Sequence, residues 1–495
     1  MSAPPFSTPS READDLPQTV PPNGKPRGTK RKKAPHVSAV TNAAVGTDVW
    51  TGRRLVAVHG SDLRYCHPWK KWLVWDGCRW KIDDTGEVER RGKGVIDSLW
   101  LAVPTIAEGE RPAFVKMVQD RSRRERLAAM IALAASEPGI PVLPGDLDKD
   151  PWLLNCQNGT VDLRTGDLRQ HRREDMLSKV TAARFNPDAG SYQWDQFIEG
   201  IFAGNLELAG FVQRLCGYAL TGDVREHVLP VFYGTGANGK TTFIEAFMSA
   251  LGADYATKAT PDLLLLKRGE THPTERASLQ GKRFVAAVET AEGRKLDETL
   301  AKELTGGDTV TARRMREDFW EFRPTCKIVL ATNNKPIVQG TDNGIWRRLR
   351  LVPFNVRFEG DKQDKGLGAK LQAERDGILA WAVRGCLDWQ REGLGEPESV
   401  RAATADYRSD SDVLGRFVAN ACLTGSPVYK VRFSHFYDAL KQWCEAGGDD
   451  LPSKKAVGQW LQREGCRELR SNGRWYSGIA LRETDVERSN DGTPF

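Results

Sequence analysis

The sequence lacks a long hydrophobic run: no stretch of about eighteen apolar residues, the minimum for a membrane span, occurs in the chain. No membrane-spanning helix and no membrane partner are therefore expected. The start, Met-Ser-Ala-Pro-Pro, also lacks the apolar segment of a secretory signal peptide. A cytoplasmic protein, in a bacterial host cell and encoded by a phage or mobile element, is the expectation.

Cysteine is present but follows no metal-binding or disulfide pattern. The nine cysteines lie far apart, and no C-x-x-C pair occurs. Cys66-His67 with Cys78 is the only cluster, and its spacing fits no common zinc site. Reduced thiols are therefore expected.

The chain also lacks a strong excess of charge of one sign. Its formal net charge is +6, so only a local concentration of Lys and Arg could indicate a nucleic-acid partner. The length of 495 residues predicts about three domains.

A phosphate-binding loop is the strongest signal that is present. The stretch Gly234–Thr242 fits G-x-x-x-x-G-K-[ST], follows the apolar run 228–233 and precedes a helical pattern over 243–251. Glycines let backbone N–H groups close around phosphate oxygens, and the helix N-terminus adds a favourable dipole. Lys240 is expected to reach the β- and γ-phosphates, and Thr241 to bind Mg²⁺. The sequence therefore predicts a nucleoside triphosphate site, for ATP with Mg²⁺, built from Gly234, Thr235, Gly236, Ala237, Asn238, Gly239, Lys240, Thr241 and Thr242.

Later segments supply groups that hydrolysis requires. The apolar strand 282–289 ends in Glu289, and the strand 327–333 ends in Asn333. Glu289 can polarise the attacking water directly or through Mg²⁺, and Asn333 can orient that water. Arg347 or Arg348 can bring positive charge to the transferring phosphoryl group, in trans if subunits form a ring. Strands at this spacing indicate a largely parallel sheet covered on both faces.

Four segments occur in a fixed order: Gly234–Thr242, Val288–Gly293, Lys302–Asp308 with Thr311–Arg313, and Ala331–Pro336 followed by Asp342–Arg348. Together they resemble the phage/plasmid primase-helicase family of superfamily 3 DNA helicases, which includes the poxvirus primase-helicase. The resemblance covers about residues 50–360. It implies an AAA+-type P-loop ATPase that forms a hexameric ring and moves 3′ to 5′ on single-stranded DNA. It assigns Walker A to 234–241, the Walker B acid to Glu289, sensor 1 to Asn333 and the arginine finger to Arg348 or Arg347.

The resemblance also places a DNA-gripping hairpin on residues 311–320. Arg313, Arg314 and Arg316 would contact phosphates there, and a solvated hairpin is the alternative. Two features depart from the family. Glu289 is not followed by a second acid, so either it acts both on the metal and as base or Glu292 helps. No D-x-D strand pair with a partner histidine is found, so primase activity is not expected.

The flanking regions are less specific. Four tryptophans between positions 69 and 80 predict the core of a small sheet in preference to base stacking, with a hairpin turn at Asp76-Gly77. Near the C-terminus, helical patterns followed by a hairpin about Asn472-Gly473 indicate a winged helix, with protein docking as the alternative to DNA binding. On DNA, Lys454 and Lys455 would face a major groove and Arg474 would lie near phosphates.

The expected fold class is α/β: an AAA+-type P-loop ATPase (superfamily 3 helicase) with an N-terminal α+β domain and a C-terminal winged-helix domain. The expected domains are a disordered basic tail (1–46), the N-terminal domain (47–185), a helical connector (186–223), the ATPase (224–410), the winged helix (411–482) and a disordered tail (483–495).

The expected function is an ATP-dependent, ring-forming DNA helicase for replication of a phage, plasmid or integrated element. Its partners would be single-stranded and forked DNA, origin duplex DNA, further copies of the chain, and a separate primase or loader. An origin-binding ATPase switch, initiator or loader is the alternative from another class. A small-molecule P-loop kinase is a second alternative, which the large flanking regions argue against.

Overall fold

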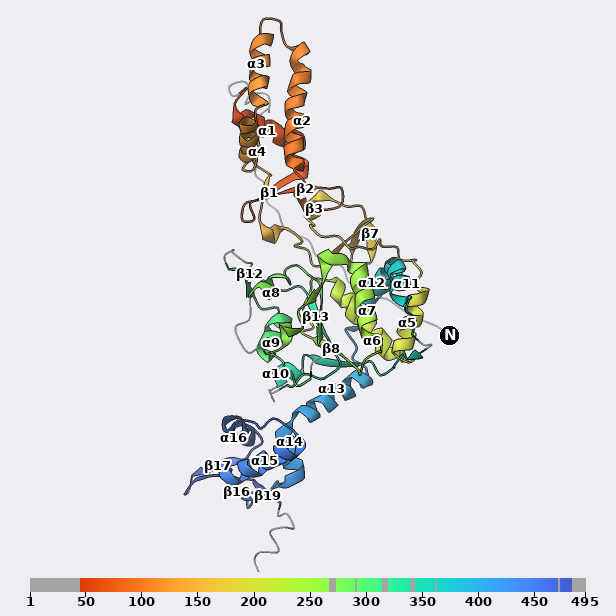
Figure 1. The fold of residues 1–495 in the computed structure, drawn as a ribbon, viewed down its shortest axis with the longest axis vertical. Coiled ribbons are helices and arrows are strands. Elements are labelled where there is room, and N and C mark those ends of the chain that lie inside the picture. Colours follow the sequence, from red (N-terminus) through yellow and green to blue (C-terminus); the bar gives the residue numbers. More distant parts are fainter. Residues whose placement is uncertain are drawn as a thin grey trace, which may run out of the picture.

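A computed structural model describes residues 45–266, 273–289, 292–313, 319–338, 343–360, 363–470 and 472–482. These residues form three parts in a row along the longest axis (Figure 1). The N-terminal helices lie at one end, a large α/β body lies in the middle, and the C-terminal helices and strands lie at the other end. Apart from residues 45 and 46, the two expected disordered tails fall outside the described residues.

The N-terminal part combines helices with a small mixed sheet. Its helices are α1 (Asp48–His59), α2 (Glu87–Ala102), α3 (Arg111–Arg121) and α4 (Arg124–Ala134). Its strands, in the order β3-β2-β1-β4, are β1 (Leu63–Cys66), β2 (Lys71–Trp75), β3 (Trp80–Ile82) and β4 (Pro141–Val142). Trp80 is 1% exposed, and Trp69, Trp72 and Trp75 pack against the apolar clusters beside it. The prediction that these rings form a core, with a hairpin at Asp76-Gly77, is confirmed.

A second small sheet leads into the central body. It consists of β5 (Leu153–Cys156), β6 (Gly159–Asp162) and β7 (Asp167–Arg169), and it is followed by the predicted helices α5 (Tyr192–Ile201) and α6 (Leu206–Leu220). Helix α6 packs on α12 (Arg375–Glu392) so closely that a Cβ on Gly217 would lie 2.0 Å from the backbone nitrogen of Cys386. One apolar cluster runs from β5 through these helices into the central sheet.

The central sheet is entirely parallel, with the order β14-β8-β13-β10-β9. Its strands are β8 (Leu229–Tyr233), β9 (Ala256–Ala259), β10 (Phe284–Glu289), β13 (Lys327–Thr332) and β14 (Leu349–Pro353). Successive residues point to opposite faces, so Phe232 and Val352 join one apolar cluster while Val231 and Leu351 join another. The prediction of a parallel sheet covered on both faces is confirmed.

Short elements on one side of this sheet carry the remaining predicted motifs. They are α8 (Pro273–Ala277), α9 (Glu298–Gly306), the antiparallel pair β11 (Val310–Ala312) and β12 (Trp320–Phe322), and α10 (Asn343–Trp346). Helix α7 (Lys240–Tyr255) covers the opposite side, together with α12.

Two buried cations tie the start of the central strands to neighbouring segments. Arg283 donates to the backbone oxygens of Leu220 (2.6 Å) and Leu153 (2.7 Å), which joins β10 to α6 and β5. Lys327 donates to the backbone oxygens of Thr221 and Asp223, and burial lowers the pKa of its ammonium to about 7. Sequence reasoning missed both contacts because they join residues far apart in the chain.

The C-terminal part follows α11 (Leu367–Ala373), α12 and α13 (Glu398–Ser411), the helix that leads out of the body (Figure 1). It contains α14 (Val413–Ala421), α15 (Phe433–Gly447), α16 (Lys454–Arg463), and strands β15 (Cys422–Thr424), β16 (Lys430–Arg432), β17 (Arg467–Arg470), β18 (Arg474–Ser477) and β19 (Ile479–Leu481). Ser453 caps α16 by accepting from the Ala456 N–H. The chain after the predicted turn at Asn472-Gly473 is divided at Gly478, where φ is +96°, into β18 and β19.

The nine cysteines are all described, and none forms a disulfide. Among the described residues no group of three or more His, Cys, Asp or Glu side chains could hold a metal ion, so the Cys66 cluster forms no such site. Within the same ranges no helix is long and apolar enough to cross a bilayer.

Candidate nucleotide-binding site

The register of the central sheet brings three predicted segments to one edge. Tyr233 on β8 pairs with Thr332 on β13, which in turn pairs with Glu289 on β10. Because all three strands are parallel, the residues that follow them lie at the same carboxyl edge, where ligands bind in α/β sheets. The glycine loop follows β8, and Asn333 follows β13, the strand between β8 and β10. The sheet order therefore places Asn333 between the loop and the end of the Glu289 strand.

The loop has a backbone that few sequences could adopt. Gly236 and Gly239 have φ of +99° and +85°, and Ala237 has a positive φ of 48°, which is uncommon for a residue with a Cβ. A Cβ on Gly234 would lie 2.3 Å from the backbone oxygen of Phe354, and one on Gly239 would lie 2.6 Å from Ile201. These contacts explain in physical terms why glycine stands at 234 and 239.

Lys240 turns inward at the start of α7. Its ammonium donates to the Gly234 backbone oxygen (2.6 Å), the Asn238 Oδ1 (3.0 Å) and the Asn333 Oδ1 (3.0 Å). The side chain is only 5% exposed, and burial lowers the pKa of its ammonium from 10.5 to about 8. Lys240 and Asn333, which were predicted to have separate roles in the site, thus meet directly across 93 residues of sequence.

A cavity of about 280 Å³ opens in front of these groups. It is lined by the loop from Gly236 onward and by Thr241, Thr242, Val288 and Asn333. The Lys240 ammonium, the N-terminus of α7 and the backbone N–H groups of the glycine loop suit the binding of a chain of phosphates.

Hard oxygen donors near this cavity fit Mg²⁺, which prefers them. The Thr241 hydroxyl lines the cavity, and the strand of Glu289 ends at the same edge. The structure describes the backbone of Glu289 but not its side chain, and Glu292 is exposed in the turn that follows. Bound Mg²⁺ would neutralise charge that develops on the phosphates.

The segment after Asn333 is held from outside by α13. The Tyr407 hydroxyl donates to the Pro336 backbone oxygen, and Tyr407 is 3% exposed. Lys335 pairs with Asp410 at 3.1 Å. Sequence reasoning missed this support because no local motif marks Tyr407. The helix that leads to the C-terminal part therefore also positions the segment that carries Asn333.

Arg347 and Arg348 lie at the opposite edge of the sheet. They precede β14, and the Leu229 N–H at the start of β8 donates to the Arg348 backbone oxygen at 2.7 Å. The five residues of β8, about 16 Å of strand, separate them from the glycine loop. Arg348 donates to the Gly344 backbone oxygen at 2.7 Å, whereas Arg347 is exposed. Neither arginine can reach the cavity of its own chain.

The predicted DNA-binding residues differ in accessibility. Arg313 lies over the ring of Phe319 at 5.0 Å beside the β11–β12 pair, while Arg314 and Arg316 fall outside the described residues. Lys454 and Lys455 are exposed at the start of α16.

Arg474 instead is partly exposed and already has partners within the C-terminal part. It donates to the Tyr476 hydroxyl at 2.6 Å, pairs with Glu468 at 3.2 Å and lies over the Phe433 ring at 4.6 Å. These contacts stabilise the packing of β18 and make its guanidinium less available to a partner than the lysines of α16.

Fold and site together define the central body as an α/β unit of the P-loop type. Comparison with known protein families gives two matches. Residues 52–203 match the "D5 N terminal like" family, and residues 232–348 match a family of unknown function, DUF5906.

Relatives from large DNA viruses match about three-fifths of the chain. "Putative helicase L207/L206" of Acanthamoeba polyphaga mimivirus is 26% identical over 343 residues, covering 64% of this chain and 35% of the viral protein. "Putative primase C962R" of African swine fever virus (strain Badajoz 1971 Vero-adapted) is 24% identical over 325 residues, covering 61% and 34%. This chain thus spans about a third of the length of these relatives.

Among solved structures, the apo A form of the NrS-1 C-terminal region is similar at 10% identity with a TM-score of 0.47. The match covers 88% of this chain and 99% of that one. The two family matches and the viral relatives support the resemblance to the primase-helicase family that the ordered motifs indicate.

Proposed function

We propose that this chain is an ATP-hydrolysing DNA helicase that acts in replication. The observation that carries the proposal is the direct contact of Lys240 with Asn333 in a phosphate-sized cavity at the end of the Glu289 strand. Lysine would bind the β- and γ-phosphates, Thr241 would bind Mg²⁺, and Glu289 would polarise water that Asn333 orients. The viral relatives named as helicases or primases support a role in DNA replication.

The arrangement of the arginines supports a ring. Because Arg347 is exposed at the edge of the sheet opposite the cavity, it can serve only the nucleotide of a neighbouring copy. A head-to-tail interface that repeats in this way forms a ring when the rotation between successive copies closes, and we propose that closed form here. We assign the arginine finger to Arg347 in preference to Arg348, whose guanidinium is already bound to Gly344. The family resemblance adds two details to the proposal, which are a ring of six copies and movement 3′ to 5′ on single-stranded DNA.

DNA would contact the ring at two places. Arg313 and the neighbouring Phe319, which is 60% exposed, would offer a cation and a stacking ring beside the β11–β12 pair. The C-terminal part, as a winged helix, would present Lys454 and Lys455 to duplex DNA, while Arg474 would support α16 from behind. Gly458 of α16 allows this support, since a Cβ there would lie 2.6 Å from the Arg474 Nη2.

Unwinding of a 3′-tailed fork by the wild-type chain and by Lys240→Ala tests the motor. ATP-dependent unwinding by the first alone is expected. ATP hydrolysis without any unwinding would favour an initiator or loader that uses ATP as a switch. Primer synthesis is assayed on the same preparations, because four of the viral relatives are named as primases.

Mixing variants tests the trans arginine. Lys240→Ala and Arg347→Ala should each lose ATPase activity, yet an equimolar mixture should regain part of it. In a randomly mixed ring about a quarter of the interfaces combine an intact loop with an intact arginine. Arg348→Ala serves as the matched control and should keep more activity than Arg347→Ala. If the mixture is as inactive as each variant alone, Arg347 does not act on the nucleotide of a neighbouring copy.

A further inference from the structure

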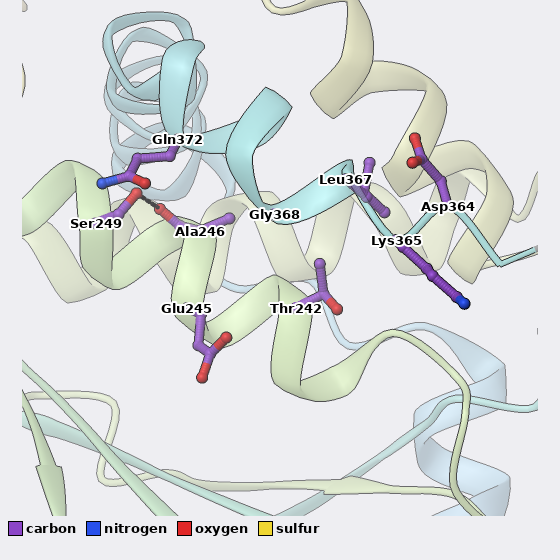
Figure 2. Close-up of a pocket in the computed structure, with 9 residues that line it drawn as sticks. All are labelled: Thr242, Glu245, Ala246, Ser249, Asp364, Lys365, Leu367, Gly368 and Gln372. Carbon is purple, nitrogen blue, oxygen red and sulfur yellow. Dashed lines mark hydrogen bonds between the residues drawn. The ribbon is translucent and has the colours of Figure 1, made fainter.

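The two sides of the phosphate cavity are built from different parts of the chain. On one side, a second cavity of about 430 Å³ lies between α7 and the segment 364–372, and Thr242 lines both cavities (Figure 2). All of the residues that line this second cavity lie between positions 242 and 372, within the central body. On the other side lie the segments that follow β10 and β13, and both of them are paired with acids of α13 or the C-terminal part.

The segments that follow β10 and β13 are joined to each other. The Leu296 N–H donates to the Ile337 backbone oxygen at 3.0 Å, and the Ile337 N–H donates to the Arg294 backbone oxygen at 2.8 Å. These bonds form a parallel bridge between Lys295 and Ile337. A displacement of one segment is therefore passed to the other.

Each of the joined segments carries a lysine that pairs with an aspartate from outside it. Lys295 pairs with Asp450 at 2.9 Å, and Lys335 pairs with Asp410 of α13 at 3.1 Å. Lys335 also lies 5.4 Å from the ring centroid of Tyr233, the last residue of β8 before the glycine loop. We call these two ion pairs the clamp. Because the aspartates are 61% and 66% exposed, solvent screens both pairs, and a polyanion can open them.

Asp450 belongs to the loop that leads into α16, the helix with the lysines proposed to bind duplex DNA. Its neighbour Asp449 pairs with Arg416 of α14 at 2.8 Å. At the end of the same loop, Ser453 caps the helix that begins at Lys454. Asp450 is therefore fixed to the C-terminal part and moves with α16.

A duplex on α16 reaches the clamp. Helix α16 lies on the side of the C-terminal part that is nearer the central body (Figure 1). Lys454 follows Asp450 by four residues, which is at most about 14 Å of extended chain. A duplex bound at Lys454 extends about 34 Å per helical turn, so its phosphates come close to the Asp450–Lys295 pair. Phosphates repel Asp450 and attract Lys295, and both effects open the pair.

We propose that the clamp holds the nucleotide site in a slow state and that duplex DNA bound at α16 opens it. The inference rests on the proposed function, because it regulates hydrolysis at the site of Lys240 and Asn333. With the clamp closed, Asn333 is held where its Oδ1 accepts from Lys240. Opening the clamp lets the segment that carries Asn333 move, so that the amide can orient the attacking water. The C-terminal part thereby couples duplex binding to the rate of hydrolysis.

Reversing the charges of the Lys295–Asp450 pair tests the clamp. In Lys295→Asp the value of kcat at saturating ATP, without DNA, should rise about two- to fivefold, the most that an exposed ion pair supports. A blunt duplex without single-stranded tails should then add little further stimulation. Asp450→Lys breaks the same pair from the other side and should give the same result. The double variant that combines both changes restores an ion pair, and it should recover the slow basal rate and the stimulation by duplex.

A matched control and a second readout separate the clamp from general charge effects. Glu445→Lys makes the same charge change as Asp450→Lys, but Glu445 pairs with Lys441 inside α15, so both rates should match the wild type. Lys295→Ala should bind a labelled blunt duplex up to about fivefold more tightly, although it loses a positive charge, because the clamp and the duplex compete. Weaker binding by Lys295→Ala would make Lys295 a direct DNA contact and overturn the clamp.

The kinetic outcomes distinguish this inference from the proposed function. A wild-type rate that duplex DNA does not change would overturn the clamp and leave the ATPase standing. The same conclusion would follow if Lys295→Asp and Asp450→Lys were no faster than the wild type without DNA, or if the double variant stayed as fast as the single variants. Failure of the wild type to hydrolyse ATP, with or without DNA, would instead remove the proposed function, and this inference with it.

Discussion

Nucleotide affinity should depend on pH through Lys240. Burial against the loop lowers the pKa of this ammonium to about 8, compared with an ordinary 10.5. Phosphates beside it would raise the pKa again, because opposite charge favours the protonated form. Below about pH 8 the lysine is already charged in the free protein, so affinity should be constant. Above it, each pH unit should weaken binding about tenfold, because a proton must be taken up with the nucleotide.

Between pH 7 and pH 9.5 the dissociation constant for ATP should therefore rise about 30-fold. Titration calorimetry in two buffers of different ionisation enthalpy would measure both the affinity and the proton uptake. The terminal phosphate, with a pKa of about 6 like that of a phosphomonoester, stays ionised throughout this range. Lys240→Arg is the control, since a guanidinium stays charged and should give a flat profile. A flat profile for the wild type would refute the reasoning.

Three further changes probe the site and the C-terminal part. In Gly234→Ala the new Cβ would press on the Phe354 backbone oxygen, so the free energy of unfolding should fall by about 1–3 kcal/mol and ATP binding should be lost. Thermal melts measure the change in stability, and titration measures ATP binding. Unimpaired ATP binding would contradict the prediction. Asn333→Ala should keep ATP affinity within a few-fold yet slow hydrolysis about 100-fold, measured as kcat at saturating ATP; an unchanged kcat would remove its role toward water. Changing Lys454 and Lys455 together to Ala should lower the salt dependence of duplex DNA binding by about 2 in log–log slope, and an unchanged slope would favour protein docking by this part.

The glycine loop was predictable because its determinants are local. The apolar strand, the loop residues and the helix that begins at Lys240 are contiguous, and the structure reproduces this order. The parallel sheet was also predictable, since its strands are continuous apolar runs of the kind buried on both faces. The meeting of Lys240 with Asn333 needed one further step, the carboxyl-edge rule for parallel strands.

Other features depend on register and packing that local sequence does not encode. The placement of Arg347 and Arg348 away from the cavity follows from where β14 begins relative to β8. The contact of Tyr407 with Pro336 joins segments 71 residues apart, and no motif marks it. Arg474 was predicted to lie near phosphates because it flanks a turn, whereas its contacts with Glu468 and the Phe433 ring depend on packing that the turn does not indicate.

The mutual contact of Lys240 and Asn333 has a consequence for the timing of the reaction cycle. In the structure the ammonium occupies the same amide oxygen that the proposed function needs for orienting water. A γ-phosphate that binds the Lys240 ammonium would break its contact with the Asn333 amide oxygen. Asn333 would therefore become free to orient water only when the nucleotide binds. The contact seen here would then belong to the nucleotide-free state, and its loss would report that phosphates have reached Lys240.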